Sequence, residues 1–73
     1  MRKKKIEKTG NMRKLTFEIV EGNESKYIEF ITDRTPIWTE QQYLRNRSNT
    51  QMYLISDEET EEERPLSREV ELG

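Results

Sequence analysis

Cysteine and histidine are both absent from this chain of 73 residues. Without cysteine no disulfide can form, and without thiolate or imidazole ligands the usual structural zinc sites are excluded. The same two absences remove the most frequent general base at neutral pH and the thiol nucleophile. The sequence therefore predicts a protein that is not an enzyme and that has no metal, no cofactor and no catalytic residues.

Glycine is scarce, and its positions do not fit the glycine-rich loops that bind phosphate. Gly10, Gly22 and Gly73 are scattered and match neither the dinucleotide-binding pattern nor the phosphate-loop pattern. Carboxylates are plentiful, but acid–base catalysis needs two of them in environments that separate their pKa values. Asp33 and Glu40 flank the expected start of a helix and form the one pair worth considering. Ordinary roles at a turn and at a helix N-terminus are the favoured interpretation.

Long apolar runs are missing as well. No segment approaches the roughly 20 apolar residues that a membrane-spanning helix needs. The basic residues near the N-terminus are not followed by the apolar stretch of a signal peptide. We therefore expect a cytoplasmic protein that has no membrane partner.

What the chain does have is charge sorted by position. Residues 1–14 carry a net charge of +6, residues 15–56 carry −2, and residues 57–73 carry −6, so the overall −2 conceals two oppositely charged ends. Like charges repel, and neither end has enough apolar surface to offset the cost of ordering the chain. The sequence predicts a flexible basic arm over residues 1–12 and an acidic, disordered tail over residues 57–73.

The apolar core between these ends is thin. Of 22 apolar residues, 16 fall in residues 15–56. A domain of about this size buries only about 60% of the surface of its unfolded chain. Small domains that lack disulfides and metals are often supported by association. We therefore expect a homo-oligomer, or a chain that packs against another protein.

Two strands and a tight turn are predicted first. Apolar and polar residues alternate from Leu15 to Val20, which is typical of a half-buried strand. The dipeptide Gly22-Asn23 favours a hairpin turn, because both residues tolerate positive φ. A second strand follows over 26–32, with bulky side chains on both faces.

A helix is expected next, ending near Asn46. Thr35 followed by Pro36 suits an N-cap and the first helical position. A capping box that begins at Thr39 offers a second possible start. The apolar stripe of this helix is sparse, so the helix needs a sheet beneath Trp38 to be stable.

The run over residues 51–56 predicts a third strand. The predicted fold class is therefore α+β, a small single domain with a β-hairpin followed by a helix and a third strand (ββαβ-like). The core covers residues 13–56 and lies between the flexible basic arm and the acidic tail. Such a sheet leaves edges open, where a second copy or a partner's strand could add.

By elimination, the leading interpretation is a small non-catalytic regulatory protein, an adaptor or inhibitor, that binds another protein through its sheet edge, helix and acidic tail. A dense carboxylate run fits a partner with a basic surface, although it could equally act as a solvating tail or pair with the basic arm. For Trp38 a place in the core is favoured over an exposed site, because few other large residues are available to bury. By composition alone, the chain is similar to phage and mobile-element accessory proteins. The candidate partner-binding residues are Asp57, Glu58, Glu59, Glu61, Glu62, Glu63, Trp38 and Tyr43.

Two alternatives remain open. One is an accessory nucleic-acid-binding protein, in which cations neutralise phosphates and an exposed aromatic ring stacks on bases. The overall acidity of the chain argues against a dedicated protein of this class. The other alternative is a small oligomeric assembly subunit. The candidate nucleic-acid contacts are Arg2, Lys3, Lys4, Lys5, Arg45 and Arg47.

Overall fold

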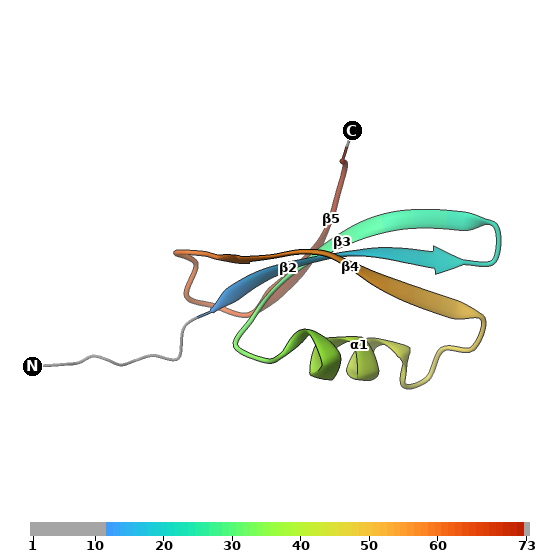
Figure 1. Cartoon of the computed structure of the whole chain (residues 1–73), viewed down its shortest axis with the longest axis horizontal. Coiled ribbons are helices and arrows are strands. Elements are labelled where there is room, and N and C mark those ends of the chain that lie inside the picture. Colours follow the sequence, from blue (N-terminus) through green and yellow to red (C-terminus); the bar gives the residue numbers. More distant parts are fainter. Residues whose placement is uncertain (1–11, 73) are drawn as a thin grey trace, which may run out of the picture.

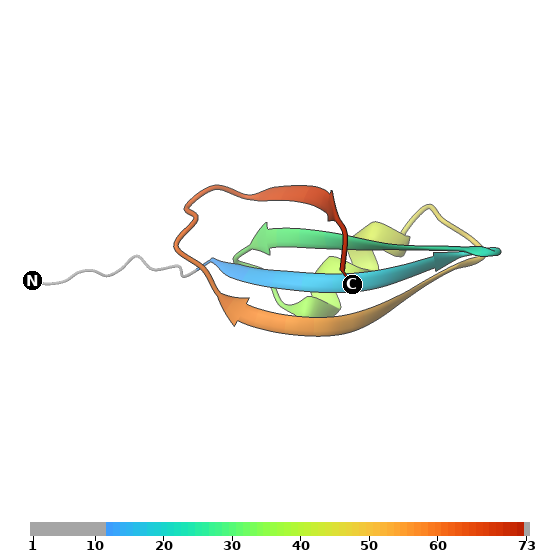
Figure 2. The same ribbon diagram turned by 90° about the horizontal axis from the view of Figure 1, so that it is seen from above.

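The computed structural model describes residues 12–72, which form an antiparallel sheet of four strands with one helix on one face (Figure 1). The strands lie side by side in the order β4-β2-β3-β5 (Figure 2). A small α+β domain is thus confirmed, and the predicted basic arm lies outside the described residues except for Met12. In chain order the elements are β2 (Arg13–Glu21), β3 (Glu24–Thr32), α1 (Pro36–Leu44), β4 (Thr50–Glu59) and β5 (Leu66–Val70).

The predicted hairpin is present. Glu21 pairs with Glu24, so Gly22 and Asn23 form the two-residue turn between β2 and β3. Gly22 has a φ of +59°, a conformation that costs glycine little because it has no Cβ. The alternating strand β2 and this turn therefore fix the register of the central pair.

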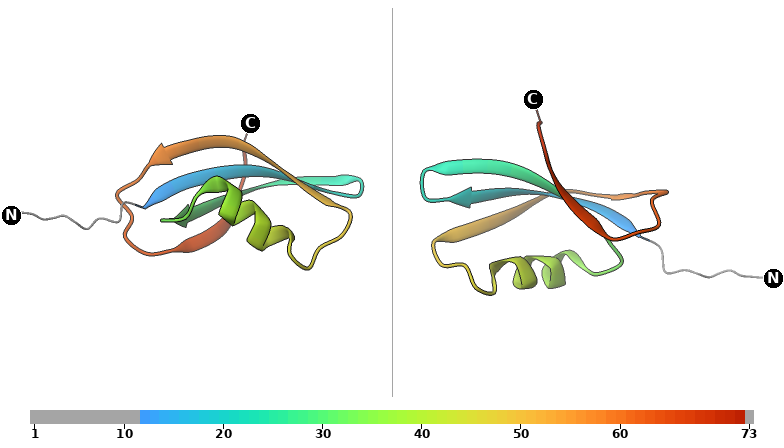
Figure 3. Two further views of the ribbon diagram at one scale, coloured as in Figure 1. Left: turned by 60° about the horizontal axis from the view of Figure 1, so that its bottom comes forward. Right: turned by 180° about the vertical axis from the view of Figure 1, so that it is seen from behind.

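The core lies between the sheet and α1. Leu15, Phe17 and Ile19 of β2 are fully buried and form a cluster with Met52 of β4, which is 6% exposed. These β2 residues share one face because side chains alternate along a strand. The helix lies across this same face (Figure 3), where Tyr43 and Leu44 pack against the cluster. With nine residues α1 is short, and no helix within residues 12–72 is long and apolar enough to cross a membrane.

The helix begins where the Thr-Pro pair predicts. The Thr35 hydroxyl accepts a hydrogen bond from the backbone N–H of Trp38 at 3.0 Å, and Pro36 is at the first position. The second possible start, at Thr39, is wrong, because Thr39 lies inside the helix and its hydroxyl donates to the Thr35 carbonyl at 3.0 Å. The helix ends at Leu44, two residues before the predicted end.

The helix phase corrects the favoured interpretation of Trp38. Thr39 is buried and Tyr43 packs against the core, so these two residues mark the inward face. Trp38 is rotated by about 100° from Thr39, since an α-helix has about 3.6 residues per turn. Trp38 is accordingly 41% exposed and is not a core residue.

The third strand is longer than predicted. The sequence predicts an end at Ser56, but β4 continues to Glu59. Its register against β2 shifts beside Thr16 and Phe17, which leaves Ile55 without a β2 partner as a bulge. Beyond the bulge, the Nε of Arg13 lies 2.8 Å from a carboxylate oxygen of Asp57. The Nζ of Lys14 lies 3.6 Å from Glu58. These opposite charges favour strand pairing where the run of acids alone predicts disorder.

A fourth strand replaces the disordered tail expected after the third. β5 pairs with β3 in antiparallel register, with Val70 opposite Tyr27 and Leu66 opposite Ile31. The order of elements is therefore ββαββ instead of ββαβ. Pairing with β3, which the local composition does not reveal, orders this segment.

Candidate protein-binding groove

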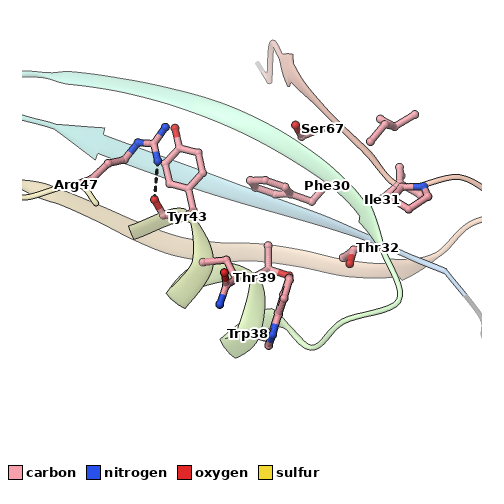
Figure 4. Close-up of a pocket in the computed structure, with 11 residues that line it drawn as sticks. Phe30, Ile31, Thr32, Trp38, Thr39, Tyr43, Arg47 and Ser67 are labelled. Carbon is pink, nitrogen blue, oxygen red and sulfur yellow. Dashed lines mark hydrogen bonds between the residues drawn. The ribbon is translucent and has the colours of Figure 1, made fainter. Parts of the chain in front are cut away.

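A groove of about 470 Å³ lies between α1 and β5 (Figure 4). It exists because one short helix covers only part of the inner face of the sheet. Phe30 lies between the two sides, with Trp38 and Tyr43 on α1 and Leu66 on β5. The lining residues are Phe30, Ile31, Thr32, Trp38, Thr39, Gln42, Tyr43, Arg47, Pro65, Leu66 and Ser67.

Aromatic contacts connect the groove to the core. The rings of Phe17 and Phe30 meet edge to face, with centroids 5.7 Å apart. Phe30 and Tyr43 repeat this geometry at 6.0 Å. Edge-to-face pairs add to the stabilisation that burial gives. Through Phe30, Tyr43 on the side of α1 is thus connected to the fully buried Phe17.

An arginine lies over each aromatic side chain that α1 contributes. The Cζ of Arg47 is 3.9 Å from the Tyr43 ring centroid, and its Nη1 donates to the Tyr43 backbone carbonyl at 2.7 Å. The Cζ of Arg34 is 4.8 Å from the centroid of Trp38. Figure 4 shows Arg47 at one end of the groove and Ile31 and Thr32 at the other. The end of the groove near the C-terminus of α1 therefore carries positive charge.

The structure brings together two of the predicted partner-binding residues, Trp38 and Tyr43, on one wall. Arg47, predicted as a nucleic-acid contact, joins them. Arg45 caps the helix by donating its backbone N–H to Gln42 at 3.4 Å and does not line the groove. Arg2, Lys3, Lys4 and Lys5 lie outside the described residues.

The six predicted acidic residues do not act as one mobile run. Residues 57–59 belong to β4, whereas residues 61–63 lie in the connection to β5. Asp57 and Glu58 pair with β2, and Glu62 lies 3.2 Å from the Nη2 of Arg68. Glu62, Glu63 and Arg64 line a hollow that shares Leu66 with the groove. The acidic connection thus adjoins the groove on the side of β5.

The role of β5 was missed because its sequence looks like part of a charged tail. Leu66, Arg68 and Val70 lie on one face of β5, but Arg68 interrupts the apolar residues, so the segment lacks the alternation that indicates a strand. Pro65 and Phe30 were also missed as lining residues. The sequence could not assign Phe30 to the groove, because its exposure depends on which part of the sheet the helix covers.

Arg68 also pairs with Glu29, the most buried carboxylate among residues 12–72. The Glu29 side chain is 12% exposed, and its Oε2 accepts a hydrogen bond from the Nε of Arg68 at 2.7 Å. This hydrogen bond raises the pKa of Arg68, and the negative charge of Glu29 raises it further.

Asp33, one of the two carboxylates considered for catalysis, has its Oδ1 3.7 Å from the Nε of Arg34. Within residues 12–72 no three carboxylates are grouped so as to hold a metal ion.

Comparison with protein-family models, with curated proteins and with solved structures finds no match for this chain. The groove is therefore interpreted from its own residues.

Proposed function

We propose that this chain is a small non-catalytic regulatory protein, an adaptor or inhibitor, that binds another protein in the groove between α1 and β5. The observation that carries the proposal is the exposure of Trp38 on one wall of a groove that also includes Phe30 and, on β5, Ser67. An apolar side chain of a partner would be buried against Trp38 and Phe30.

The composition of the groove supports a protein partner. Residues that dominate binding energy at protein interfaces are enriched in tryptophan, tyrosine and arginine. Trp38, Tyr43 and Arg47 supply one of each along a single wall. The contact between Arg47 and Tyr43 orders both side chains before a partner arrives, which lowers the entropy lost on binding.

Charge around the groove defines the segment that fits. Arg47 lies at one end, and the acidic connection adjoins the other side through Leu66. The complementary segment has an apolar side chain in its middle, an acidic residue toward Arg47 and a basic residue toward Glu62 and Glu63. Complementary charge of this kind sets orientation and speeds association. This arrangement limits the role of the acidic residues to the edge of the site.

A substitution pair tests the site in a pull-down from the source cells with the full chain. Trp38→Ala removes the exposed aromatic wall, whereas Ile37→Ala changes a neighbouring exposed residue that does not line the groove. We expect a protein that co-purifies with the native chain and with Ile37→Ala to be lost with Trp38→Ala. Equal retention by both variants would count against the groove.

Photo-cross-linking then locates the contact. Gln42 and Gln41 are adjacent and both exposed, but only Gln42 lines the groove. A photoreactive phenylalanine derivative at position 42 should cross-link to the partner, and the same group at position 41 should not. A cross-link from position 41 alone would place the partner elsewhere on the helix.

The arginine–aromatic contacts make nucleic acid a weaker candidate for this groove. A base stacks on the face of an aromatic ring. Arg47 covers one face of Tyr43, and Arg34 covers one face of Trp38. These contacts leave less aromatic surface for stacking than the sequence alone indicates.

A further inference from the structure

The outer edge of β4 exposes three consecutive large apolar residues. Tyr53, Leu54 and Ile55 are each about half exposed, and β4 is an outer strand of the sheet. The strand spans ten residues, and its first seven, 50–56, contain no charged residue and no proline. Natural edge strands are usually short, charged or interrupted by proline, because an open edge can pair with another chain.

The other outer strand has these protective features. β5 is only five residues long and includes Arg68 and Glu69, and Pro65 precedes it. In β4 the bulge at Ile55 and the acids of residues 57–59 are confined to the second half of the strand, and residues 50–54 have neither feature. Of the two edges, β4 is therefore the one suited to accept a further strand.

The charges that flank β4 select an antiparallel partner with the same sequence. Residues 41–56 contain Arg45 and Arg47 and no acid, whereas residues 57–63 contain six acids and no base. A second copy of β4 in parallel would place the two acidic ends side by side, which is unfavourable. In the antiparallel orientation, each acidic end lies beside the basic flank of the other copy.

Carboxylates remain available for this contact. Asp57, Glu58 and Glu62 already pair with cations of their own chain. Among residues 12–72, no ion pair involves Glu59, Glu61 or Glu63. Antiparallel pairing centred near Tyr53 brings Glu59 of one copy toward the segment before β4 of the other, which contains Arg45 and Arg47.

We propose that a second copy of this chain covers the β4 edge, so that the two β4 strands pair antiparallel about a twofold axis near Tyr53–Ile55. This twofold axis is perpendicular to the sheet. A rotation of 180° about it reverses the strand direction, so the two β4 strands pair antiparallel, and it keeps both sheets in one layer. The two four-stranded sheets become continuous, and both α1 helices lie on the same face. The inference goes beyond the proposed function, since the groove is formed by α1, β3 and β5.

Light scattering coupled to size-exclusion chromatography measures the state of the native full chain at micromolar concentration. We expect a mass twice the 8.9 kDa of one chain. Leu54→Lys places a charge in the proposed interface, and Leu72→Lys is the matched control, because the two leucines are 46% and 48% exposed. Leu54→Lys should halve the mass with an unchanged circular dichroism spectrum, and Leu72→Lys should not. A native chain that remains monomeric overturns the proposal.

Single cysteines provide a test that does not depend on a destabilising charge. Because the native chain has no cysteine, any disulfide in a single-cysteine variant joins two chains. Directly opposed antiparallel residues have Cα atoms about 4.5–5.5 Å apart, within the range that a disulfide spans. Under mild oxidation, at least one of Tyr53→Cys, Leu54→Cys and Ile55→Cys should form a covalent dimer, and Leu72→Cys should not. Failure of all three, or equal cross-linking through position 72, overturns the proposal.

Discussion

Arg68 of β5 and Glu29 of β3 are opposed in the strand register and joined through their side chains, with the Nε of Arg68 donating to Oε2 of Glu29 at 2.7 Å. The same guanidinium reaches Glu62 at 3.2 Å. One side chain thus connects β5, β3 and the acidic connection. Because β5 forms one side of the groove, this contact helps to hold that side in place against β3.

Replacing Arg68 by methionine should release β5 while the rest of the sheet stays folded. The substitution keeps an unbranched side chain but leaves the largely buried Glu29 without its cation, an unfavourable state for a buried carboxylate. Hydrogen exchange followed by mass spectrometry should show faster exchange over residues 66–70 and little change over residues 13–21. Arg64→Met is the control, since no ion pair within residues 12–72 includes Arg64.

The effect of Arg68→Met should be the same at pH 7 and pH 9. Folding raises the pKa of Arg68 through its hydrogen bond to Glu29. A group with a raised folded pKa contributes its full stability below its unfolded pKa and loses it only as the pH rises through the folded value. For an arginine this loss lies far above pH 9. A difference in β5 exchange between native and variant chains that shrinks from pH 7 to pH 9 would contradict this assignment.

Phe17 and Trp38 should respond very differently to truncation. Phe17 is fully buried, so Phe17→Ala should lower the free energy of unfolding by about 3–5 kcal/mol. Trp38 is 41% exposed, so Trp38→Ala should cost about 1 kcal/mol, typical of a partly exposed position. Urea denaturation monitored by circular dichroism measures both. Similar losses for the two variants would show that Trp38 supports the core and would weaken its assignment to binding.

The hairpin, the helix cap and the buried face of β2 could be predicted because each depends on neighbouring residues. Thr35-Pro36 and Gly22-Asn23 carry their conformational preferences with them, and the alternation in β2 needs no other element. The ends of β4 and β5 could not be predicted in this way. Asp57 meets Arg13 across 44 positions of the chain, and Arg68 meets Glu29 across 39. An interpretation from neighbouring residues includes only the repulsion among the acids and leaves out these distant cations.

The exposure of Trp38 could not be predicted from the sequence, for a different reason. Both its size and the scarcity of large apolar residues favour burial. Its placement depends on the phase of α1, which the cap at Thr35 and the buried Thr39 determine. The groove itself depends on β5, so no part of the sequence taken alone predicts it.

Gly22→Ala should destabilise the protein through the backbone alone. An added Cβ would meet only the Asn49 amide nitrogen at 3.8 Å, an ordinary contact distance. The φ of +59° is unfavourable for alanine, so we expect a loss of about 1 kcal/mol in urea denaturation. Gly22→Asn should lose less, because asparagine tolerates this conformation better. Asn23→Ala is the control within the same turn. Equal stability of Gly22→Ala and the native chain would mean that the turn adopts another conformation.

Nucleic-acid binding can be separated from protein binding by its dependence on salt. If Arg45 and Arg47 contacted phosphates, the affinity for single-stranded DNA would fall steeply with salt, with a slope of about 0.7 per phosphate neutralised. We expect instead that fluorescence anisotropy of a labelled oligonucleotide shows only weak binding by the full chain at 150 mM salt. The slope should be unchanged by Arg45→Gln with Arg47→Gln, because in the proposed function neither arginine contacts a phosphate. Tight binding whose salt slope falls in the double variant would favour the nucleic-acid function over the protein-binding groove.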